Sequence, residues 1–258
     1  ANLASASPAA TSTDVSGITT NINLGANSAK TYFLLTAITN GIESKTNGTQ
    51  TVATAHPLEF IAVAGDSTAT STIWMDRNLG AERVATSAAD ADGFGGLYQF
   101  GRPTDGHQLR NSGKTATRAS NISPNHADFI TKSTVGDWLA AGVDNNGAIR
   151  AAIWSSTDGS GICPTGFRVP LIAELEAEAA AWTPQDDPAG AFNSSLKLPT
   201  AGFRLHSGSV IPRFVYKSAS IEPVQNTFNL ISLYYSNPDI ERSASAFNYG
   251  QAVRCIQN

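Results

Sequence analysis

The two cysteines, Cys163 and Cys255, are the residues whose surroundings most restrict their chemistry. Cys163 opens the segment Cys-Pro-Thr-Gly-Phe-Arg-Val-Pro, and Cys255 lies in Gly-Gln-Ala-Val-Arg-Cys-Ile, so each stands beside a short apolar strand signal with an arginine. Such thiols form a disulfide, stay buried and free, or act as nucleophiles. A disulfide between neighbouring strands is the simplest of these, and it favours an oxidising compartment. We therefore expect Cys163 and Cys255 to be bonded in an extracellular or cell-surface protein.

The other residues that could carry out catalysis or hold a metal ion do not form a familiar set. The histidines are far apart in sequence and lack the short spacing of zinc ligands. A Gly-x-Ser-x-Gly elbow, a phosphate loop and a Gly-x-Gly-x-x-Gly motif are all absent. We therefore expect a non-enzymatic protein without catalytic residues or a metal site. The four histidines are His56, His107, His126 and His206.

Two carboxylate pairs raise the question of calcium. Asp90 with Asp92, and Asp186 with Asp187, lie in polar stretches, and hard cations bind several loop oxygens. A solvated surface is the simpler interpretation of such pairs. We expect no cofactor, and calcium is the alternative.

The clearest secondary-structure signal is a helix over residues 171–182. Leu171, Leu175, Ala179 and Trp182 recur on one face, which predicts a buried stripe, and Thr183-Pro184 would end the helix. Glycines interrupt residues 85–160, which predicts long loops. Two short helices are expected within these loops, near 127–131 and 135–141. Strand signals follow the long helix at 197–198, 202–206, 227–235 and 251–256.

Strand signals run from Ile18 to Gly65, so the first 68 residues are predicted to form a small β-rich extension before a domain over 69–258. Segment 1–17 is rich in Ala, Ser and Thr and has too little apolar surface to offset the entropy of ordering it. We therefore expect it to act as an assembly arm, an extended strand in a groove of another copy of the chain. The residues expected to anchor this arm are Leu3, Val15 and Ile18.

Five motifs follow one another along residues 70–258. They are Trp74–Ala81, Leu97–Arg102 with Asp105–His107, Cys163–Pro170, Leu196–Arg204 and Ala252–Cys255. In this order they resemble the Fibrobacter succinogenes major paralogous domain, a family related to the C-type-lectin-like and formylglycine-generating-enzyme folds. The resemblance covers nearly three quarters of the chain. It implies an α+β, C-type-lectin-like domain with long loops, in secreted, surface-displayed or phage-borne proteins.

The resemblance also bears on individual residues. His107 matches a motif position, and we expect it to hydrogen-bond a loop rather than to act in catalysis. Formylglycine-generating enzymes act through cysteines, and none remains here beyond the expected pair. Calcium-dependent lectins use a Glu-Pro-Asn-like loop, whereas Glu222-Pro223 is followed here by Val224. Calcium-dependent sugar binding is therefore not expected.

Aromatic residues near the C-terminus offer a second interpretation of the domain. Related phage proteins expose a ligand-binding face in this region, and tyrosine is a good rigid contact residue. Core packing is the alternative for these side chains. The residues concerned are Tyr234, Tyr235, Phe247 and Tyr249.

Composition limits the choice of partners. The formal charge is −4 and the basic residues are scattered, which argues against nucleic acid as a partner. No run approaches the roughly 18–20 apolar residues of a membrane span. We expect an exported surface or appendage protein, a self-assembling filament subunit with a lectin-like domain. The alternative is an adhesin of a phage tail or cell surface, whose partner is a surface glycan or protein receptor.

Overall fold

The computed structural model describes residues 46–47, 50–51, 60–67, 72–131, 136–185, 187–224, 227–235 and 240–258. The chain divides into two units, Ala1–Ala62 and Val63–Asn258. In the first, β1 (Thr46–Asn47) and β2 (Gln50–Thr51) form an antiparallel pair. The expected arm residues Leu3, Val15 and Ile18, and residues 68–71 around the expected domain boundary, lie outside the described residues.

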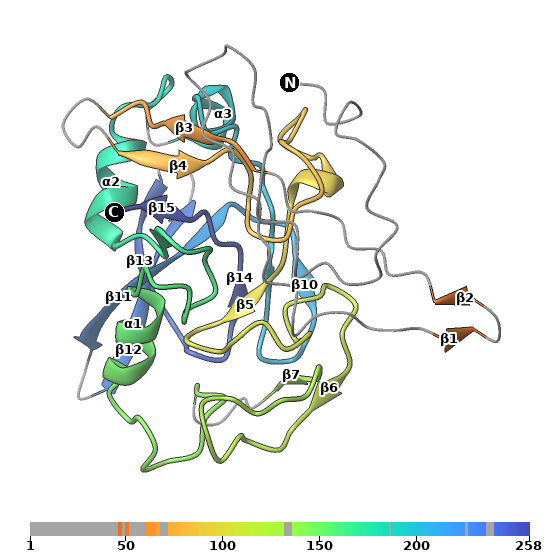
Figure 1. The fold of residues 1–258 in the computed structure, drawn as a ribbon. Helices are drawn as coiled ribbons and strands as arrows, with labels where there is room; N and C mark the ends of the chain where they lie inside the picture. Colours follow the sequence, from red (N-terminus) through yellow and green to blue (C-terminus); the bar gives the residue numbers. More distant parts are fainter. Residues whose placement is uncertain are drawn as a thin grey trace. The chain divides into compact units, whose positions relative to one another are not determined.

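One four-stranded sheet of the second unit gathers three of the sequence motifs. It has the order β3-β4-β15-β8, and β15 pairs antiparallel with both of its neighbours. Ile256 is the register partner of Trp74 on one side and of Arg168 on the other. The sheet therefore places the end of the chain between two segments that are distant in sequence (Figure 1). Its strands are β3 (Ala62–Ala64), β4 (Ile73–Met75), β8 (Phe167–Arg168) and β15 (Ile256–Gln257).

A second four-stranded sheet has the order β10-β9-β14-β5. Its inner strand β14 pairs antiparallel with β5 and β9, so the Leu97–Arg102 motif lies beside Gly250 and Gln251. The strands are β5 (Tyr98–Gln99), β9 (Phe203–Arg204), β10 (Val210–Ile211) and β14 (Gly250–Gln251).

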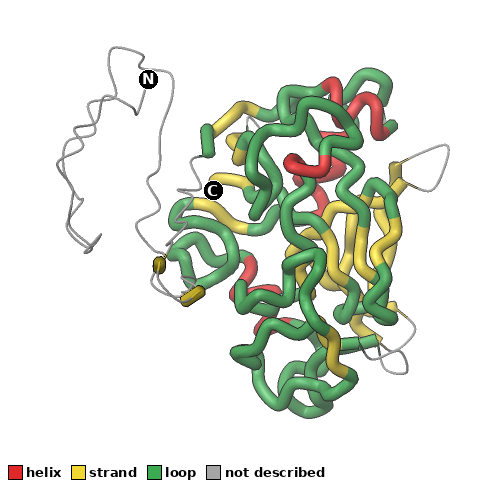
Figure 2. The backbone as a smooth tube through the Cα atoms, turned by 90° about the vertical axis from the view of Figure 1, so that its right-hand side faces the viewer, coloured by secondary structure: helices red, strands yellow, loops and turns green. Residues whose placement is uncertain are grey.

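The longest strands form a three-stranded antiparallel meander. It consists of β11 (Val215–Val224), β12 (Thr227–Tyr235) and β13 (Ile240–Ser245), and a register shift between Lys217 and Ile221 interrupts the first pairing. Figure 2 shows the three strands side by side, with much of the rest of the unit in loops. The sequence signal over 227–235 corresponds to β12.

Loops occupy most of the region between β5 and β8. Within it, β6 (Lys114–Thr115) and β7 (Phe129–Ile130) form a short parallel pair at the lower end of the unit in Figure 1. The expectation of a helix near 127–131 is therefore wrong, because this segment pairs with β6. Residues 136–141 also form no helix, whereas α1 (Ala148–Trp154) was not expected.

Helix α2 (Ile172–Ala179) is the longest of the described helices. The Glu174 carboxylate accepts a hydrogen bond from the Leu171 backbone N–H at 2.7 Å and so caps the first turn. Because Leu171 is the extended N-cap residue, its side chain is 42% exposed, and its expected burial is wrong. Ile172 takes its place in the buried stripe, together with Leu175 and Ala179. The other regular helix after it is α3 (Pro188–Asn193).

The core packs around two tryptophans. Trp74 on β4 and Trp182 beyond α2 are buried, and the Trp182 ring makes an edge contact with Phe214 at a centroid distance of 6.1 Å. Strands outnumber helices, and the mixed arrangement is compatible with the expected α+β class.

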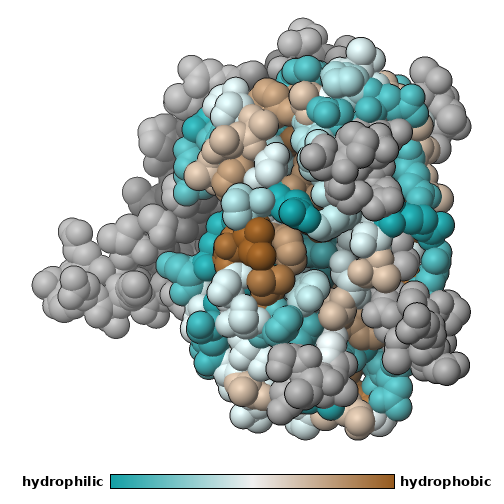
Figure 3. All heavy atoms as spheres, turned by 180° about the vertical axis from the view of Figure 1, so that it is seen from behind, coloured by the Kyte–Doolittle hydropathy of each residue, from teal (hydrophilic) through white to brown (hydrophobic). Residues whose placement is uncertain are grey.

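On the face seen in Figure 3, hydrophobic side chains gather in one central patch with hydrophilic residues beside it.

Among the described helices, none has the length and apolar character needed to cross a membrane.

Candidate functional site

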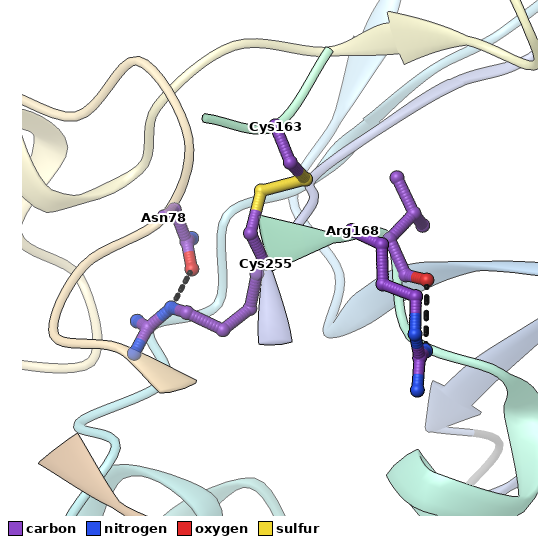
Figure 4. The surroundings of a disulfide bond; sticks show 6 residues. Asn78, Cys163, Arg168 and Cys255 are labelled. Atoms are coloured by element: carbon purple, nitrogen blue, oxygen red, sulfur yellow. Dashed lines mark hydrogen bonds between the residues drawn. A yellow bond between two sulfur atoms is a disulfide. The ribbon is translucent and has the colours of Figure 1, made fainter. Parts of the chain in front are cut away.

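The two cysteines form a disulfide, as their motifs predict. The Sγ atoms of Cys163 and Cys255 lie 2.08 Å apart, and 92 positions separate the two residues in sequence. Both side chains are buried, with Cys255 beside β15 and Cys163 just before β8 (Figure 4). Neither thiol is free to act as a nucleophile.

The arginine next to Cys255 fixes the C-terminal segment to the first motif. Arg254 is buried and donates hydrogen bonds to the Asn78 side chain and to the backbone oxygens of Met75 and Leu196. Burial lowers its pKa to about 10. Figure 4 shows the bond to Asn78 alongside the disulfide. Arg254 therefore has a structural role.

His107 is fully buried and both of its ring nitrogens are engaged. Nδ1 lies 2.7 Å from Asp105 Oδ1, and Nε2 accepts a hydrogen bond from the Gln99 backbone N–H at 3.0 Å. The imidazole is therefore neutral, with its proton on Nδ1 and no lone pair left to act as a general base. Burial lowers the pKa of His107 to about 4. The expected role in holding a loop is confirmed.

Two further buried ionisable side chains are also engaged by the backbone. Lys217 Nζ donates to the carbonyl oxygens of Tyr98 and Tyr249, and burial lowers the pKa of Lys217 well below its usual value. The Glu178 carboxylate accepts from the backbone N–H groups of Asp66 and Ser67, and burial raises its pKa. Both side chains join segments of the fold.

Arg102 links this buried network to the loop region. Its guanidinium donates to the Asp105 carboxylate, to the Gln99 side chain and to the backbone oxygens of His126 and Asp128. The bond to the His126 oxygen is 2.6 Å long, and the Arg102 side chain is fully buried. The network therefore holds residues 126–128 through their main-chain atoms.

The loop between β6 and β7 encloses a cleft of about 300 Å³. The two ends of the loop are held together by the strand pair and by a hydrogen bond from the Phe129 N–H to the Gly113 oxygen. Compact loops whose ends lie close together often carry function. All lining residues come from this one segment: Thr115, Thr117, Arg118, Ala119, Ser120, Asn121, Pro124, His126 and Asp128.

Polar groups in this cleft have unused hydrogen-bonding capacity. His126 Nδ1 accepts from the Asp128 N–H, so the neutral ring carries its proton on Nε2, which is unpartnered among the described residues. Neither the Asp128 carboxylate nor the Arg118 guanidinium has a hydrogen-bond or ion-pair partner there, and Arg118 Nε is enclosed without one. We take this cleft as the candidate functional site.

Sequence reasoning did not single out Arg118 or Asp128. His126 was considered only as one of four scattered histidines. The available signal was a polar stretch between Gly113 and Phe129 that contains an arginine, a histidine and an aspartate without an apolar run. Polarity alone does not distinguish such a loop from an ordinary solvated one.

A second cleft, of about 240 Å³, lies beside the Trp74–Ala81 motif. Its lining includes Gly80, Gly95, Gly96, Tyr98 and Arg110. The guanidinium of Arg110 already donates to the backbone oxygens of Gly95 and Ala201 and lies over the Phe94 ring. This cleft therefore offers a ligand fewer unused charged groups.

The four aromatic residues expected to form a ligand face do not make one cluster of contacts. Phe247 is 3% exposed and stacks on Phe100, so it belongs to the core. Tyr249 stacks on His206, whereas the Tyr234 hydroxyl accepts a hydrogen bond from Arg213. Tyr235 is partly buried against the core.

The carboxylates considered for calcium have other partners. Asp90 accepts hydrogen bonds from Thr86 and pairs with Arg83, which also binds Asp92. The hydrogen bonds from Thr86 lower the pKa of Asp90. Within the described ranges, no group of three or more His, Cys, Asp or Glu side chains is placed to hold a metal ion. Asp186 lies outside the described residues, while Asp187 caps the N-terminus of α3.

Comparison with known proteins gives no further identification. No family model, no curated protein and no solved structure matches this chain.

Proposed function

We propose that this chain is a non-enzymatic, exported surface or appendage protein that binds a partner through its C-terminal domain. The observation that carries the proposal is that the described side chains most suited to catalysis are bonded within the fold. The cysteines are bonded to each other, both nitrogens of His107 are occupied, and Lys217 binds two carbonyl oxygens. The unused groups are instead collected in an open cleft, which suits binding.

The disulfide supports the extracellular part of the proposal. Disulfides persist in oxidising compartments and are rare in the cytosol. A bridge across 92 positions also stabilises a loop-rich domain against unfolding. We further propose that the domain is C-type-lectin-like and akin to the Fibrobacter succinogenes major paralogous family, on the five sequence motifs alone.

Adhesion is the function that the cleft favours. A loop held by buried residues, with Arg118 and Asp128 side chains that form no hydrogen bond within the described residues, is suited to contact a glycan or protein on another surface. The self-assembling filament subunit is the second candidate. It rests on the composition of residues 1–17 and the arm residues Leu3, Val15 and Ile18.

A deletion of residues 1–17 separates the two candidates. Sedimentation would measure assembly of the intact and shortened chains, and retention on target cells would measure adhesion. If the protein is a filament subunit, the deletion abolishes assembly. If it is an adhesin, the shortened chain binds as well as the intact one. A protein that stays in the cytosol of its own cells, with both cysteines reduced, contradicts both candidates.

A further inference from the structure

Among the described contacts, one arginine differs from the others, and it lies in the loop between β6 and β7. Every other arginine forms at least one hydrogen bond within the fold, including the exposed Arg83 and Arg242. Within the part of the chain that the structure describes, Arg118 makes no hydrogen bond or ion pair, although its Nε atom is enclosed. An enclosed donor without a partner is costly to stability. Such a cost is expected where a residue serves binding.

The same cleft contains a negative group that accepts no hydrogen bond from the described residues, although its charge acts on the buried Arg102 guanidinium. Asp128 and Arg118 both line it, and they do not form an ion pair with each other. The Asp128 carboxylate lies against Gly113, where an added Cβ would come within 2.2 Å of Oδ1. Because an ionised carboxylate only accepts hydrogen bonds, Asp128 can accept them from a ligand, and Arg118 can donate them to a ligand.

Most of the remaining lining groups are short and polar, and Ala119 and Pro124 are the apolar ones. Thr117, Ser120 and Asn121 are exposed at the cleft, and His126 presents an Nε2–H donor. Hydroxyl and amide groups can exchange hydrogen bonds with the hydroxyls of a ligand in either direction. A volume of about 300 Å³ is at the lower end of the range for ligand pockets. It suits a unit of monosaccharide size rather than a long peptide.

We propose that this cleft binds a carboxylate-bearing sugar unit of a surface glycan, such as a uronic acid residue. Arg118 holds the sugar carboxylate through charge-assisted hydrogen bonds, for which its planar guanidinium is well suited. Asp128 accepts hydrogen bonds from sugar hydroxyls, and His126 donates to a ring or hydroxyl oxygen. The inference rests on the proposed adhesive function and names the class of its ligand.

The test uses the full chain and five probes in isothermal titration calorimetry: oligogalacturonate, oligoglucuronate, the methyl ester of oligogalacturonate, neutral maltotriose and free alanine. We expect the native chain to bind at least one uronate and to bind the ester at least ten-fold more weakly. Arg118→Gln should remove this preference for the free acid. Arg242→Gln, which removes the same charge from an exposed position outside the cleft, should keep it. Asp128→Asn should weaken binding of acid and ester alike.

Thermal unfolding of the same variants separates binding from structure. Because Arg118 has no hydrogen-bond or ion-pair partner among the described residues, Arg118→Gln should leave the Tm unchanged or raise it. Arg204→Gln, which removes bonds to Ser112 and to the Leu109 oxygen, should lower the Tm. A drop of similar size for Arg118→Gln would show that Arg118 is structural and would overturn the proposal. Arg118→Lys keeps the positive charge but loses the planar guanidinium that can donate two parallel hydrogen bonds to a carboxylate. This variant should retain a reduced preference for the acid.

Three other outcomes contradict the proposal. The native chain could fail to bind either uronate at millimolar concentration, Arg118→Gln could keep the preference for the acid, or free alanine could bind as tightly as the uronates. The last result would assign the cleft to a zwitterion. If the protein adheres to target cells and neither uronate competes, the adhesive function stands and the sugar assignment fails.

Discussion

Asp105 Oδ1 and His107 Nδ1 lie 2.7 Å apart inside the fold, and the opposite ring nitrogen of His107 accepts the Gln99 backbone N–H. This pairing of a carboxylate with an imidazole resembles part of a catalytic triad. In a triad the second ring nitrogen faces a nucleophile, whereas here it accepts a hydrogen bond from a main-chain amide. The same Asp105 carboxylate also binds Arg102, which holds the carbonyl oxygens of His126 and Asp128. A pair that could have served chemistry instead supports the wall of a cleft.

The first prediction concerns pH. Burial lowers the pKa of His107 to about 4, so between pH 6.5 and 4 only the unfolded chain takes up this proton. The free energy of unfolding should therefore fall as the pH falls through this window, and each pKa unit corresponds to about 1.4 kcal/mol. The contribution of His107 is on the order of 3 kcal/mol. Urea denaturation at pH 7 and pH 4.5 measures it, and His107→Gln should reduce the pH dependence. An NMR titration that finds His107 protonated at pH 6 in the folded chain would contradict this assignment.

The second prediction concerns the disulfide. Cys255→Ser should lower the free energy of unfolding by about 4–5 kcal/mol, because the bridge closes a loop of 92 positions. Chemical denaturation of the oxidised protein and of the variant gives the difference. Cys163→Ser should cost a similar amount, and the double variant should cost little more than either single change. A loss below 1 kcal/mol in the single variants would argue against a bridge that constrains the unfolded chain.

The third prediction concerns the helical stripe. Trp182→Ala should cost roughly 3–5 kcal/mol, because the indole is 3% exposed and packs on Phe214. Leu171→Ala is the matched control. It should cost less than about 1 kcal/mol, because Leu171 stands at the N-cap position of the helix and is 42% exposed. Equal losses for the two variants would mean that Leu171 is packed in solution.

The fourth prediction concerns the support of the cleft. Arg102→Met leaves the Asp105 carboxylate and two backbone oxygens without their buried donor, which should cost about 3–5 kcal/mol. Hydrogen exchange should quicken at the Phe129 and Thr131 amides, which bond the β6 segment. Arg242→Met, from an exposed ion pair, should cost less than about 1 kcal/mol. Unchanged exchange at Phe129 and Thr131 would show that Arg102 does not hold this loop.

Some elements could be predicted from the sequence because local pattern decided them. The run of β-forming residues over 227–235 corresponds to β12, and the apolar spacing after Pro170 corresponds to α2. The cysteine motifs were matched correctly because each lies beside a strand. Leu171 was misplaced because the repeat fits a stripe that begins at Leu171 as well as one that begins at Ile172. The capping contact from Glu174 selects the second.

The loop region could not be predicted in the same way. Phe129–Ile130 is too short a segment to distinguish a strand from a helical turn, and its partner Lys114–Thr115 is equally short. Tertiary hydrogen bonds hold the pair together: Gln99 donates to the Ile130 oxygen and Arg102 to the His126 oxygen, across 31 and 24 positions. The cleft depends on this long-range network. Arg118 therefore stands out only in three dimensions, where the described part of the chain supplies no hydrogen-bond or ion-pair partner for it.

The hydrogen bonds from Arg102 to the loop backbone have a consequence for which loop side chains can be replaced during evolution. Arg102 binds the main-chain oxygens of His126 and Asp128, and every amino acid carries such an oxygen. The exposed side chains of Thr117, Ser120 and Asn121 can therefore be exchanged without removing the anchor that closes the loop. A library of variants randomised at these three positions should remain folded while its members differ in what they bind. The fold thus separates the residues that can diversify from those that keep the domain intact.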